Sequence, residues 1–383
     1  MRFDHVLVGG GLQNGLVALG LLHHDPAHRL AIVERAPRIG GNHTWCFHAA
    51  DVDPGAAAFV DPLAGWRWPG YTVRFPDRER TLDEPYAMIA SSAFAAAVEA
   101  AVAAAPNAVI LTGAEAVRIE PRRVVLADGR ILDAGAVIDA RGPDRASVDP
   151  RCGWQTFVGL EVELDAPHGL DRPLLMDATV PQFDGFRFFY LLPLDDRRLL
   201  VEDTRFADDR AIDAAAYEAE IAAYIAARGW TVAAIHRREQ GALPLPWVAS
   251  PPPPADGVLR AGFAGGFFHP VTGYSFPLAT RVAALVATTP IAALPARLDA
   301  LRAEIRGRQR FCHLLNRAMF PHCAPAERWQ LMSRFYRRPA GVIRRFYALR
   351  MTPWDRFVSV AGPVPRCLRF RPRPLVALEE QAA

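Results

Sequence analysis

The hydrophobic pattern of the first residues predicts a strand, a helix and a second strand. Residues 3–8 form an apolar run, residues 12–24 follow an amphipathic helical pattern, and residues 30–33 are again apolar. The glycine-rich segment 9–15 separates the first strand from the helix, and the second strand ends at Glu34. A strand, a glycine turn and a helix in this order are typical of a nucleotide-binding βαβ unit. We therefore expect a Rossmann-type domain that begins at the N-terminus.

The pattern then changes from strands that alternate with helices to consecutive strands. Strands are expected at residues 157–164, 174–180, 186–194 and 199–206, followed by a helix at 211–228 and a strand at 231–237. Successive strands joined by short turns predict an antiparallel sheet. We expect an α/β fold with an added α+β part, in which residues 1–150 begin a cofactor domain and 151–250 form a substrate domain. Residues 255–294 return to the cofactor domain, and 295–383 form a helical, arginine-rich C-terminal region.

Composition narrows the classes of protein to consider. The 383 residues are 51% hydrophobic and 22% charged, which is typical of a soluble globular protein. All 44 basic residues are arginine, so Schiff-base chemistry and a P-loop lysine are excluded. The five cysteines are widely spaced, which is typical of reduced thiols in the cytosol. The pairs Cys312-His313 and His322-Cys323 match no zinc pattern, and we expect them in the core rather than at a metal.

The charge is distributed unevenly. Residues 297–373 hold 18 arginines and four acidic residues, a net charge of +14 in a chain whose total is +3. No uncharged apolar run reaches the ~18 residues of a membrane span, and no signal peptide is expected ahead of the first strand. We expect a cytoplasmic protein whose basic region has its own partner or surface.

The first glycine loop has the features of a pyrophosphate site. Backbone N–H groups at a helix N-terminus attract anions, and absent side chains let a phosphate approach. The third glycine of the usual G-x-G-x-x-G motif is replaced by Asn14, and Glu34 stands where a carboxylate accepts the ribose hydroxyls. The residues expected at the cofactor here are Val8, Gly9, Gly10, Gly11, Leu12, Asn14 and Glu34.

Two further glycine motifs favour FAD over NAD. Residues 40–43, Gly-Gly-Asn-His, follow the ribose acid, as in flavoproteins that bind two dinucleotides. Residues 262–275 are similar to the G-D-A-x-x-x-x-x-P-x-x-G segment of flavoprotein hydroxylases, except that Phe263 replaces the aspartate that holds the ribityl chain. The additional residues expected at FAD are Gly40, Gly41, Asn42, His43, Gly262, Pro270, Thr272, Gly273 and Tyr274.

Five motifs in order resemble the flavoprotein lycopene cyclases of bacterial carotenoid biosynthesis. They are G-G-N-H-T-W at 40–45, M-D-A-T at 176–179, F-F-Y-L-L-P-L at 188–194, E-D-T-R at 202–205 and H-P-V-T-G-Y-S-F-P at 269–277. The resemblance implies that the ψ end groups of lycopene are protonated and closed to β-ionone rings, giving β-carotene via γ-carotene. It also implies an isomerase or intramolecular lyase that needs reduced FAD without net redox change, with NAD(P)H as the reductant.

This chemistry requires an acid in a dry pocket, and Glu202 matches the essential acidic position of the family. It follows an apolar strand segment, where desolvation raises the pKa of a carboxyl group. Strand alternation sends Glu202 and Asp203 to opposite faces, so one of them can face the substrate. Asp177 is the second-choice acid, although it could cap its own loop. The alternative for Glu202 is a salt bridge with Arg187 or Arg205.

Aromatic and basic residues complete the expectations. Trp45, Phe188 and Tyr190 could stabilise a carbocation through their π faces, or could be ordinary core. His43 and His269 could touch the flavin or be structural. The basic C-terminal region predicts peripheral binding to anionic lipid at the cytoplasmic face of the inner membrane, where carotenoids dissolve. A solvated surface is the alternative, and nucleic acid is not expected because no recognition fold is present.

Two rival functions fit the same motifs. A flavin-dependent hydroxylase or prenyl-chain reductase of this fold would consume NAD(P)H or oxygen in each turnover. A carotenoid- or lipid-binding protein without catalysis would release its pigment unchanged.

Overall fold

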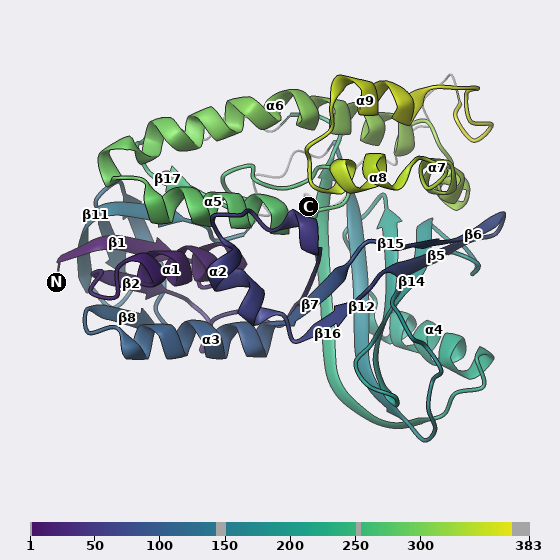
Figure 1. Ribbon diagram of the computed structural model, residues 1–383, viewed down its shortest axis with the longest axis horizontal. Coiled ribbons are helices and arrows are strands. Elements are labelled where there is room, and N and C mark those ends of the chain that lie inside the picture. The colour runs from purple at the N-terminus through teal and green to yellow at the C-terminus, as the bar shows by residue number, and fades with distance from the viewer. Residues whose placement is uncertain (1, 143–150, 250–253, 370–383) are drawn as a thin grey trace, which may run out of the picture.

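A computed structural model describes residues 2–142, 151–249 and 254–369. Two bodies built on sheets stand side by side, and the last helices of the chain, drawn in yellow-green and yellow, lie above the second body (Figure 1). The predicted domain boundary at 150 and residues 370–383 of the predicted C-terminal region lie outside the described residues. The architecture confirms the predicted α/β fold with an added antiparallel part.

The first sheet is the predicted nucleotide-binding unit. Its strand order is β8-β2-β1-β11-β10-β9, with β17 paired to β11. Parallel pairing aligns Val8 with Val33 and Asp139, so three strands end at one edge of the sheet, where ligands of such folds bind. The strands are β1 (Arg2–Val8), β2 (Leu30–Val33), β8 (Ala108–Leu111), β9 (Ala116–Glu120), β10 (Arg123–Leu126), β11 (Ile131–Asp139) and β17 (Leu259–Arg260).

Helices α1 (Leu12–His24), α3 (Ser91–Ala104) and α5 (Phe276–Thr288) pack together beside this sheet. Gly15 allows the close approach of α1 to α3, because a Cβ there would lie 2.4 Å from the ring of Phe94. The apolar faces of these helices form one core with β1 and β2. The short helix α2 (Ala57–Val60) contacts α1 from the side.

The second sheet has the strand order β16-β12-β15-β14-β13-β5-β6. Its strands are β5 (Tyr71–Phe75), β6 (Arg78–Leu82), β12 (Cys152–Leu164), β13 (Leu174–Asp177), β14 (Gly185–Pro193), β15 (Arg198–Ala207) and β16 (Val232–Pro246). All neighbours are antiparallel except β13 and β5. Strands β5 and β6 come from the segment assigned to the first domain, so residues 1–150 contribute to both sheets. Helix α4 (Ala214–Ala227) covers one face of this sheet.

The strand predicted at 231–237 extends to Pro246. Gly241, Pro244 and Pro246 interrupt the sequence pattern, but β16 is an edge strand, where proline is tolerated because only one side of the strand is paired. A small sheet of β3 (Thr44–His48), β7 (Tyr86–Ala90) and β4 (Trp66–Trp68) lies between the two bodies.

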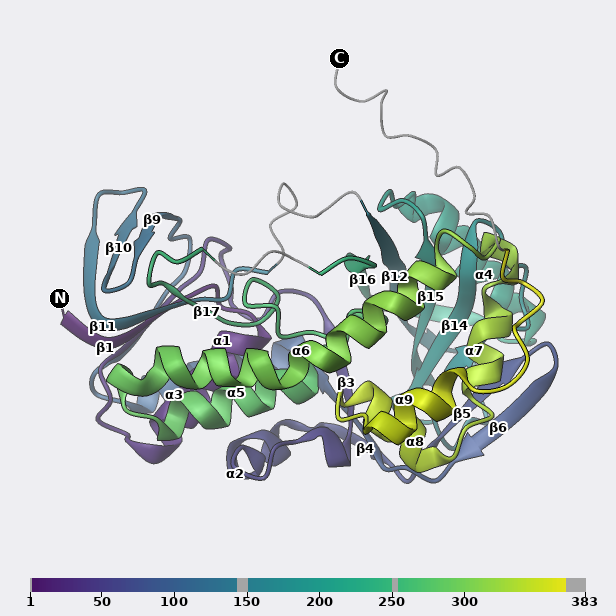
Figure 2. The ribbon, with the colours of Figure 1, turned by 90° about the horizontal axis from the view of Figure 1, so that it is seen from above.

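The C-terminal helices are α6 (Leu294–Met319), α7 (Trp329–Phe335), α8 (Ala340–Tyr347) and α9 (Pro353–Val360). Helix α6 runs across both bodies and contacts α5 and β16 (Figure 2). Leu298 and Ile305 of α6 lie in the first core, and Met332 and Ile343 lie in the second. The region is therefore an integral part of both cores. No helix among the described residues is long and apolar enough to cross a membrane.

Candidate active site

One continuous cavity of about 2950 Å³ lies between the two bodies. Its walls come from the glycine loops of the first body, the small sheet, one face of the second sheet and helix α6. A typical ligand site of ~300–1,000 Å³ holds one small molecule, so this cavity has room for two ligands of FAD or carotenoid size.

The glycine-lined end of the cavity lies at the edge where β1 and β2 finish. Gly9 has φ of +96°, a conformation that favours glycine, and a Cβ on Gly11 would meet no atom within 4 Å. Gly11 therefore presents open backbone at the N-terminus of α1, whereas a Cβ on Gly9 would lie 3.0 Å from the backbone oxygen of Ala140. One oxygen of Glu34 accepts from Gly10 N at 2.7 Å and the other from Ala36 N at 2.8 Å, which orients the carboxylate beside the loop.

The other two glycine motifs join the first one at the cavity. Gly40, Gly262 and Gly273 have φ of +82°, +58° and +63°, respectively. A Cβ on Gly40 would lie 2.9 Å from the backbone oxygen of Ser91. Thirteen of the sixteen residues predicted to contact the cofactor line the cavity, namely Val8, Gly9, Gly11, Leu12, Glu34, Gly40, Gly41, His43, Gly262, Pro270, Thr272, Gly273 and Tyr274.

The remaining three, Gly10, Asn14 and Asn42, do not line the cavity. A Cβ on Gly10 would lie 2.6 Å from the side chain of Ile39, so this glycine permits packing behind the loop. The amide of Asn14 donates to the carbonyl oxygens of Val8 and Gly9 at 2.9 and 3.0 Å and holds the turn from inside. Asn42 donates to the carbonyl of Arg238 and connects the loop to β16.

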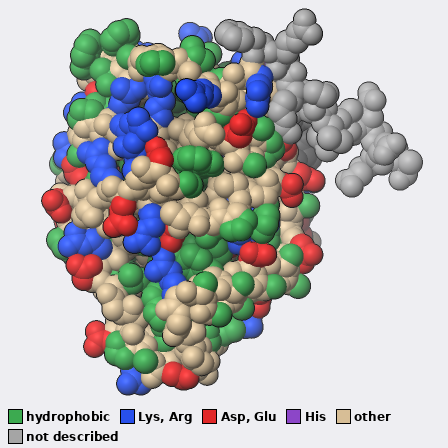
Figure 3. Space-filling view, turned by 90° about the vertical axis from the view of Figure 1, so that its right-hand side faces the viewer, with side chains coloured by type: hydrophobic (Ala, Val, Ile, Leu, Met, Phe, Trp, Pro, Cys, Tyr) green, Lys and Arg blue, Asp and Glu red, His purple; other side chains and the backbone are tan. Residues whose placement is uncertain are grey.

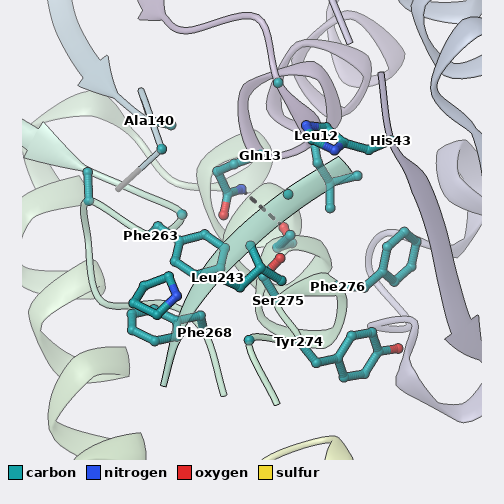
Figure 4. Close-up of a pocket in the computed structure, with 18 of the residues that line it drawn as sticks. Leu12, Gln13, His43, Ala140, Leu243, Phe263, Phe268, Tyr274, Ser275 and Phe276 are labelled. Carbon is teal, nitrogen blue, oxygen red and sulfur yellow. Dashed lines mark hydrogen bonds between the residues drawn. The ribbon is translucent and has the colours of Figure 1, made fainter. Parts of the chain in front are cut away.

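Gln13 also lines the cavity, although no sequence motif marks it as a site residue. Phe263, which replaces the usual aspartate, stacks on Phe268 with ring centroids 4.6 Å apart. Gln13 lies on the same side of the cavity, and its amide oxygen points toward Phe263 (Figure 4). The amide nitrogen donates to Ala279 O at 3.2 Å, whereas the buried oxygen has no partner among the described residues. An unsatisfied acceptor at this place fits a ribityl hydroxyl.

The second end of the cavity is one face of the second sheet. Tyr190, Glu202, Gly159 and Glu239 form a row across β14, β15, β12 and β16, each paired with the next. Tyr190, Glu202 and Glu239 line the cavity. The predicted alternation is confirmed, because Glu202 faces the cavity and Asp203 does not.

The surroundings of Glu202 make it a neutral acid. Burial raises its pKa to about 8, the charge of Glu239 acts in the same direction, and a hydrogen bond from the Thr204 hydroxyl opposes them. The alternative salt bridges of Glu202 with Arg187 or Arg205 are absent from the described residues, because both arginines bind Asp203 instead. The carboxyl of Glu202 is therefore able to donate a proton near neutral pH.

Asp203 and Asp177, the other predicted acids, lie outside the cavity in ion-paired networks. Asp203 is fully buried and accepts two hydrogen bonds from Arg187, each of 2.9 Å. Asp177 accepts from Tyr224 and Arg228, both at 2.7 Å. Burial alone would raise the pKa of Asp177, but hydrogen bonds from Thr179 and Tyr224 outweigh it and lower the pKa. Both carboxylates stabilise the sheet and α4, and we propose no catalytic role for them.

Aromatic residues surround the acid. Trp45, Phe188 and Tyr190, the predicted substrate residues, line the cavity. The Tyr190 hydroxyl lies 2.6 Å from that of Tyr86, and burial raises the pKa of both groups well above the usual value. Burial also raises the pKa of the Cys46 thiol to about 12, so this cysteine is not a nucleophile. The wall is thus rich in π faces, and its thiol and phenol groups stay neutral.

His43 and His269, the two histidines predicted near the flavin, lie at different places relative to the cavity. His43 lines the cavity, and burial lowers its pKa. His269 is 1% exposed and stands behind the wall, where its ring accepts from Val271 N, and burial lowers its pKa to about 3. His269 is therefore a neutral structural residue. Among the described residues, no group of three or more His, Cys, Asp or Glu is placed to hold a metal ion.

Solved structures of low sequence identity share this fold. A geranylgeranyl bacteriochlorophyll reductase-like protein from Thermoplasma acidophilum matches with a TM-score of 0.62 and 12% identity, covering 96% of this chain and 97% of that one. A probable FAD-dependent monooxygenase from Pseudomonas aeruginosa matches with a TM-score of 0.59 and 18% identity, covering 86% and 98%. These likenesses establish a flavoprotein-type fold.

Relatives of higher identity identify the family. A lycopene beta-cyclase from Paracoccus sp. (strain N81106 / MBIC 01143) is 40% identical, with 97% of this chain and 98% of that protein covered. A lycopene beta-cyclase from Pseudescherichia vulneris is 41% identical, with 94% and 95% covered. The family model described as lycopene cyclase protein matches residues 4–368. With its motifs gathered around one cavity and its relatives aligned over nearly the whole length, this chain belongs to the lycopene cyclase family.

Proposed function

We propose that this protein is a lycopene β-cyclase that converts the ψ end groups of lycopene to β-ionone rings. The observation that carries the proposal is the position of the Glu202 carboxyl at the aromatic end of the cavity, where burial raises its pKa. Glu202 donates its proton to the terminal double bond of a ψ end, which leaves a tertiary carbocation. The internal double bond closes the six-membered ring, and a ring carbon then loses a proton. One proton is added and one is lost, so no electrons are transferred overall.

The cavity wall protects the cation. Phe188, Tyr190 and Trp45 present π faces that each stabilise a desolvated cation by about 1–2 kcal/mol. Burial keeps the Cys46 thiol protonated, and the raised pKa values of Tyr86 and Tyr190 keep both phenols neutral. A neutral thiol or phenol is a weaker trap for a carbocation than a thiolate or phenolate, which favours ring closure over capture by these side chains.

The glycine-lined end fits FAD. Gly9 and Gly11 at the N-terminus of α1 would hold the pyrophosphate, Glu34 the ribose hydroxyls and Gln13 the ribityl chain. Reduced FAD would supply an electron-rich neighbour for the cation when bound, with NAD(P)H as the reductant. Arg302, Arg306 and Arg310 on α6 line the same cavity and would attract the anionic nicotinamide nucleotide.

The C-terminal helices carry a surface that fits a membrane. Trp354, Phe357, Val360 and Val364, which we call the α9 patch, are 67%, 59%, 51% and 66% exposed. Arg334 and Arg338 donate to the backbone of the loop after α9, next to the patch. Apolar and arginine side chains lie together near the top of the face in Figure 3, over these helices. A Trp and Phe surface with nearby arginines suits peripheral docking on anionic lipid of the inner membrane's cytoplasmic face.

The proposed function is tested by anaerobic incubation with lycopene in liposomes and chemically reduced FAD, with Glu202→Gln in parallel. Monocyclic and dicyclic products of unchanged mass, absent with the variant, are expected. Products of changed mass that require oxygen or excess NAD(P)H would instead show a hydroxylase or reductase, and unchanged lycopene would show a binding protein.

A further inference from the structure

Glu239 is a second acid at the end of the cavity where Glu202 lies, and it stands on β16 just beyond the strand predicted at 231–237. It is 3% exposed and lines the cavity. Its oxygen Oε2 accepts from Arg237 Nη1 at 2.6 Å and from the Thr44 hydroxyl at 2.9 Å. Its oxygen Oε1 is buried and has no partner among the described residues. One oxygen is thus anchored, and the other has free lone pairs.

The unpaired oxygen Oε1 of Glu239 lies next to Gly159, on the side of Glu239 that faces Glu202. Gly159 is the direct cross-strand partner of both Glu202 and Glu239. With strands spaced about 4.8 Å apart, the two Cα atoms lie roughly 10 Å from each other. A side chain on the central strand would fill this gap, since a Cβ on Gly159 would lie 3.2 Å from Oε1 of Glu239. The absence of that side chain opens a space in which the two carboxyl groups share one environment.

We propose that Glu202 and Glu239 form a carboxyl pair that holds one proton beside Gly159, in which Glu239 adds to the effect of burial and helps to keep Glu202 protonated. Arg237 stabilises a negative charge on Glu239, and this charge disfavours a second one on Glu202. After Glu202 gives its proton to the alkene, both members are charged in a dry cavity. The proton released from the ring carbon then returns to the pair and restores it. This inference rests on the acid role proposed for Glu202.

The effect of Glu239 on the protonation of Glu202 must be distinguished from the effects of the other charged or titratable groups nearby. Glu161 lies one row away on β12 and also pairs with Arg237, at 3.3 Å. The groups that surround the pair are Arg237 on β16, Tyr190 on β14, Glu161 on β12, Cys46 on β3, Tyr86 on β7, His43 in the preceding loop, and Asp203 on the opposite face of β15.

The test is the protonation midpoint of Glu202 in the full-length protein reconstituted with FAD. The infrared band of a buried protonated carboxyl is followed against pH and assigned by its loss in Glu202→Gln. In Glu239→Gln the midpoint is expected to fall by about 1–2 pH units, because the neighbouring negative charge is removed. The upper pH limit of lycopene cyclisation should fall with it. An unchanged midpoint would overturn the proposal.

Two matched variants exclude a merely structural effect. Glu161→Gln removes the other carboxylate bound to Arg237 and is expected to shift the midpoint by less than about half a unit. Arg237→Gln is expected to raise the midpoint, because the pair loses the cation that stabilises its second charge. A fall in both Glu239→Gln and Arg237→Gln would indicate general loosening of β16 and reject the pair. If wild-type protein leaves lycopene unchanged, the proposed function fails, while the infrared midpoints still decide the inference.

Discussion

Glu202 and Asp203 are adjacent on β15, yet their carboxyl groups lie on opposite faces of the sheet. Glu202 lines the cavity, with its proton retained by burial. Asp203 is 0% exposed and is bound by Arg187 and Arg205 on the side of α4. The two neighbouring acids therefore have different surroundings, and their variants should separate chemistry from stability.

Replacing Glu202 by Gln should abolish cyclisation while the protein stays folded. Gln keeps a similar shape but has no acidic proton, so we expect at least a ~10³-fold loss of turnover. Product analysis after incubation with lycopene and reduced FAD measures the loss, and bound FAD serves as the folding control. Turnover within tenfold of wild type would remove Glu202 from the mechanism.

Replacing Asp203 by Asn should have the reverse effect. Arg187 is 1% exposed and would lose its main carboxylate, so we expect destabilisation of about 3–5 kcal/mol. The turnover of the folded fraction should stay within a few-fold of wild type. Thermal unfolding and activity per bound FAD measure the two effects. Full loss of turnover with unchanged unfolding would assign Asp203 to catalysis.

The stability difference between wild type and Glu202→Gln should depend on pH. The folded pKa of Glu202 is about 8, above the unfolded value of 4.5. This carboxyl contributes most to stability below the unfolded pKa, and the contribution is lost as pH rises from the unfolded pKa to the folded pKa, because the unfolded carboxyl ionises first. At pH 7 the variant should therefore be more stable by about 3 kcal/mol, and at pH 4 the two should be alike. Thermal unfolding of both proteins across this range tests the prediction, and parallel curves would contradict it.

Replacing Gln13 by Ala should weaken FAD binding. Loss of one buried hydrogen bond to the ribityl chain corresponds to about 1 kcal/mol, or a roughly five-fold higher Kd. Flavin fluorescence titration of the apoprotein measures the change. Gln330→Ala on α7, outside the cavity lining, is the matched control. Equal affinity in both variants would place the ribityl contact elsewhere.

Replacing both Trp354 and Phe357 by Ser should reduce binding to anionic vesicles by at least ~10-fold. Burial of each aromatic side chain in the membrane contributes about 1.5–3 kcal/mol to the free energy of binding. Flotation with vesicles of phosphatidylglycerol and phosphatidylcholine measures this. Val117→Ser with Ile131→Ser is the control, since these side chains are 60% and 50% exposed on the first body. Point changes are preferable to removal of the C-terminal region, because α6 contributes Leu298 and Ile305 to the core. Equal binding by both double variants would reject docking through the α9 patch.

The cofactor end of the site could be predicted from the sequence because its determinants are local. Gly9, Gly11 and Glu34 follow one another within a single βαβ unit, and backbone geometry alone places them at a strand edge. Gln13 escaped notice because its importance depends on Phe263, which is 250 positions away in the chain but lies on the same side of the cavity.

The end of the cavity around Glu202 depends on pairings between strands that no local sequence pattern reveals. Alternation correctly separated Glu202 from Asp203, because the two-residue period belongs to the strand itself. Alternation alone does not predict which face of the strand is covered by α4 and which face lines the cavity. Glu239 was missed because Gly241 and two prolines disguised an edge strand, and because its relation to Glu202 exists only through Gly159 on the strand between them. The sequence by itself determined the cofactor fold, the family motifs and Glu202 as the candidate acid. The tertiary structure alone decided which carboxyl groups share a cavity, since strand order and register bring together residues that the chain keeps far apart.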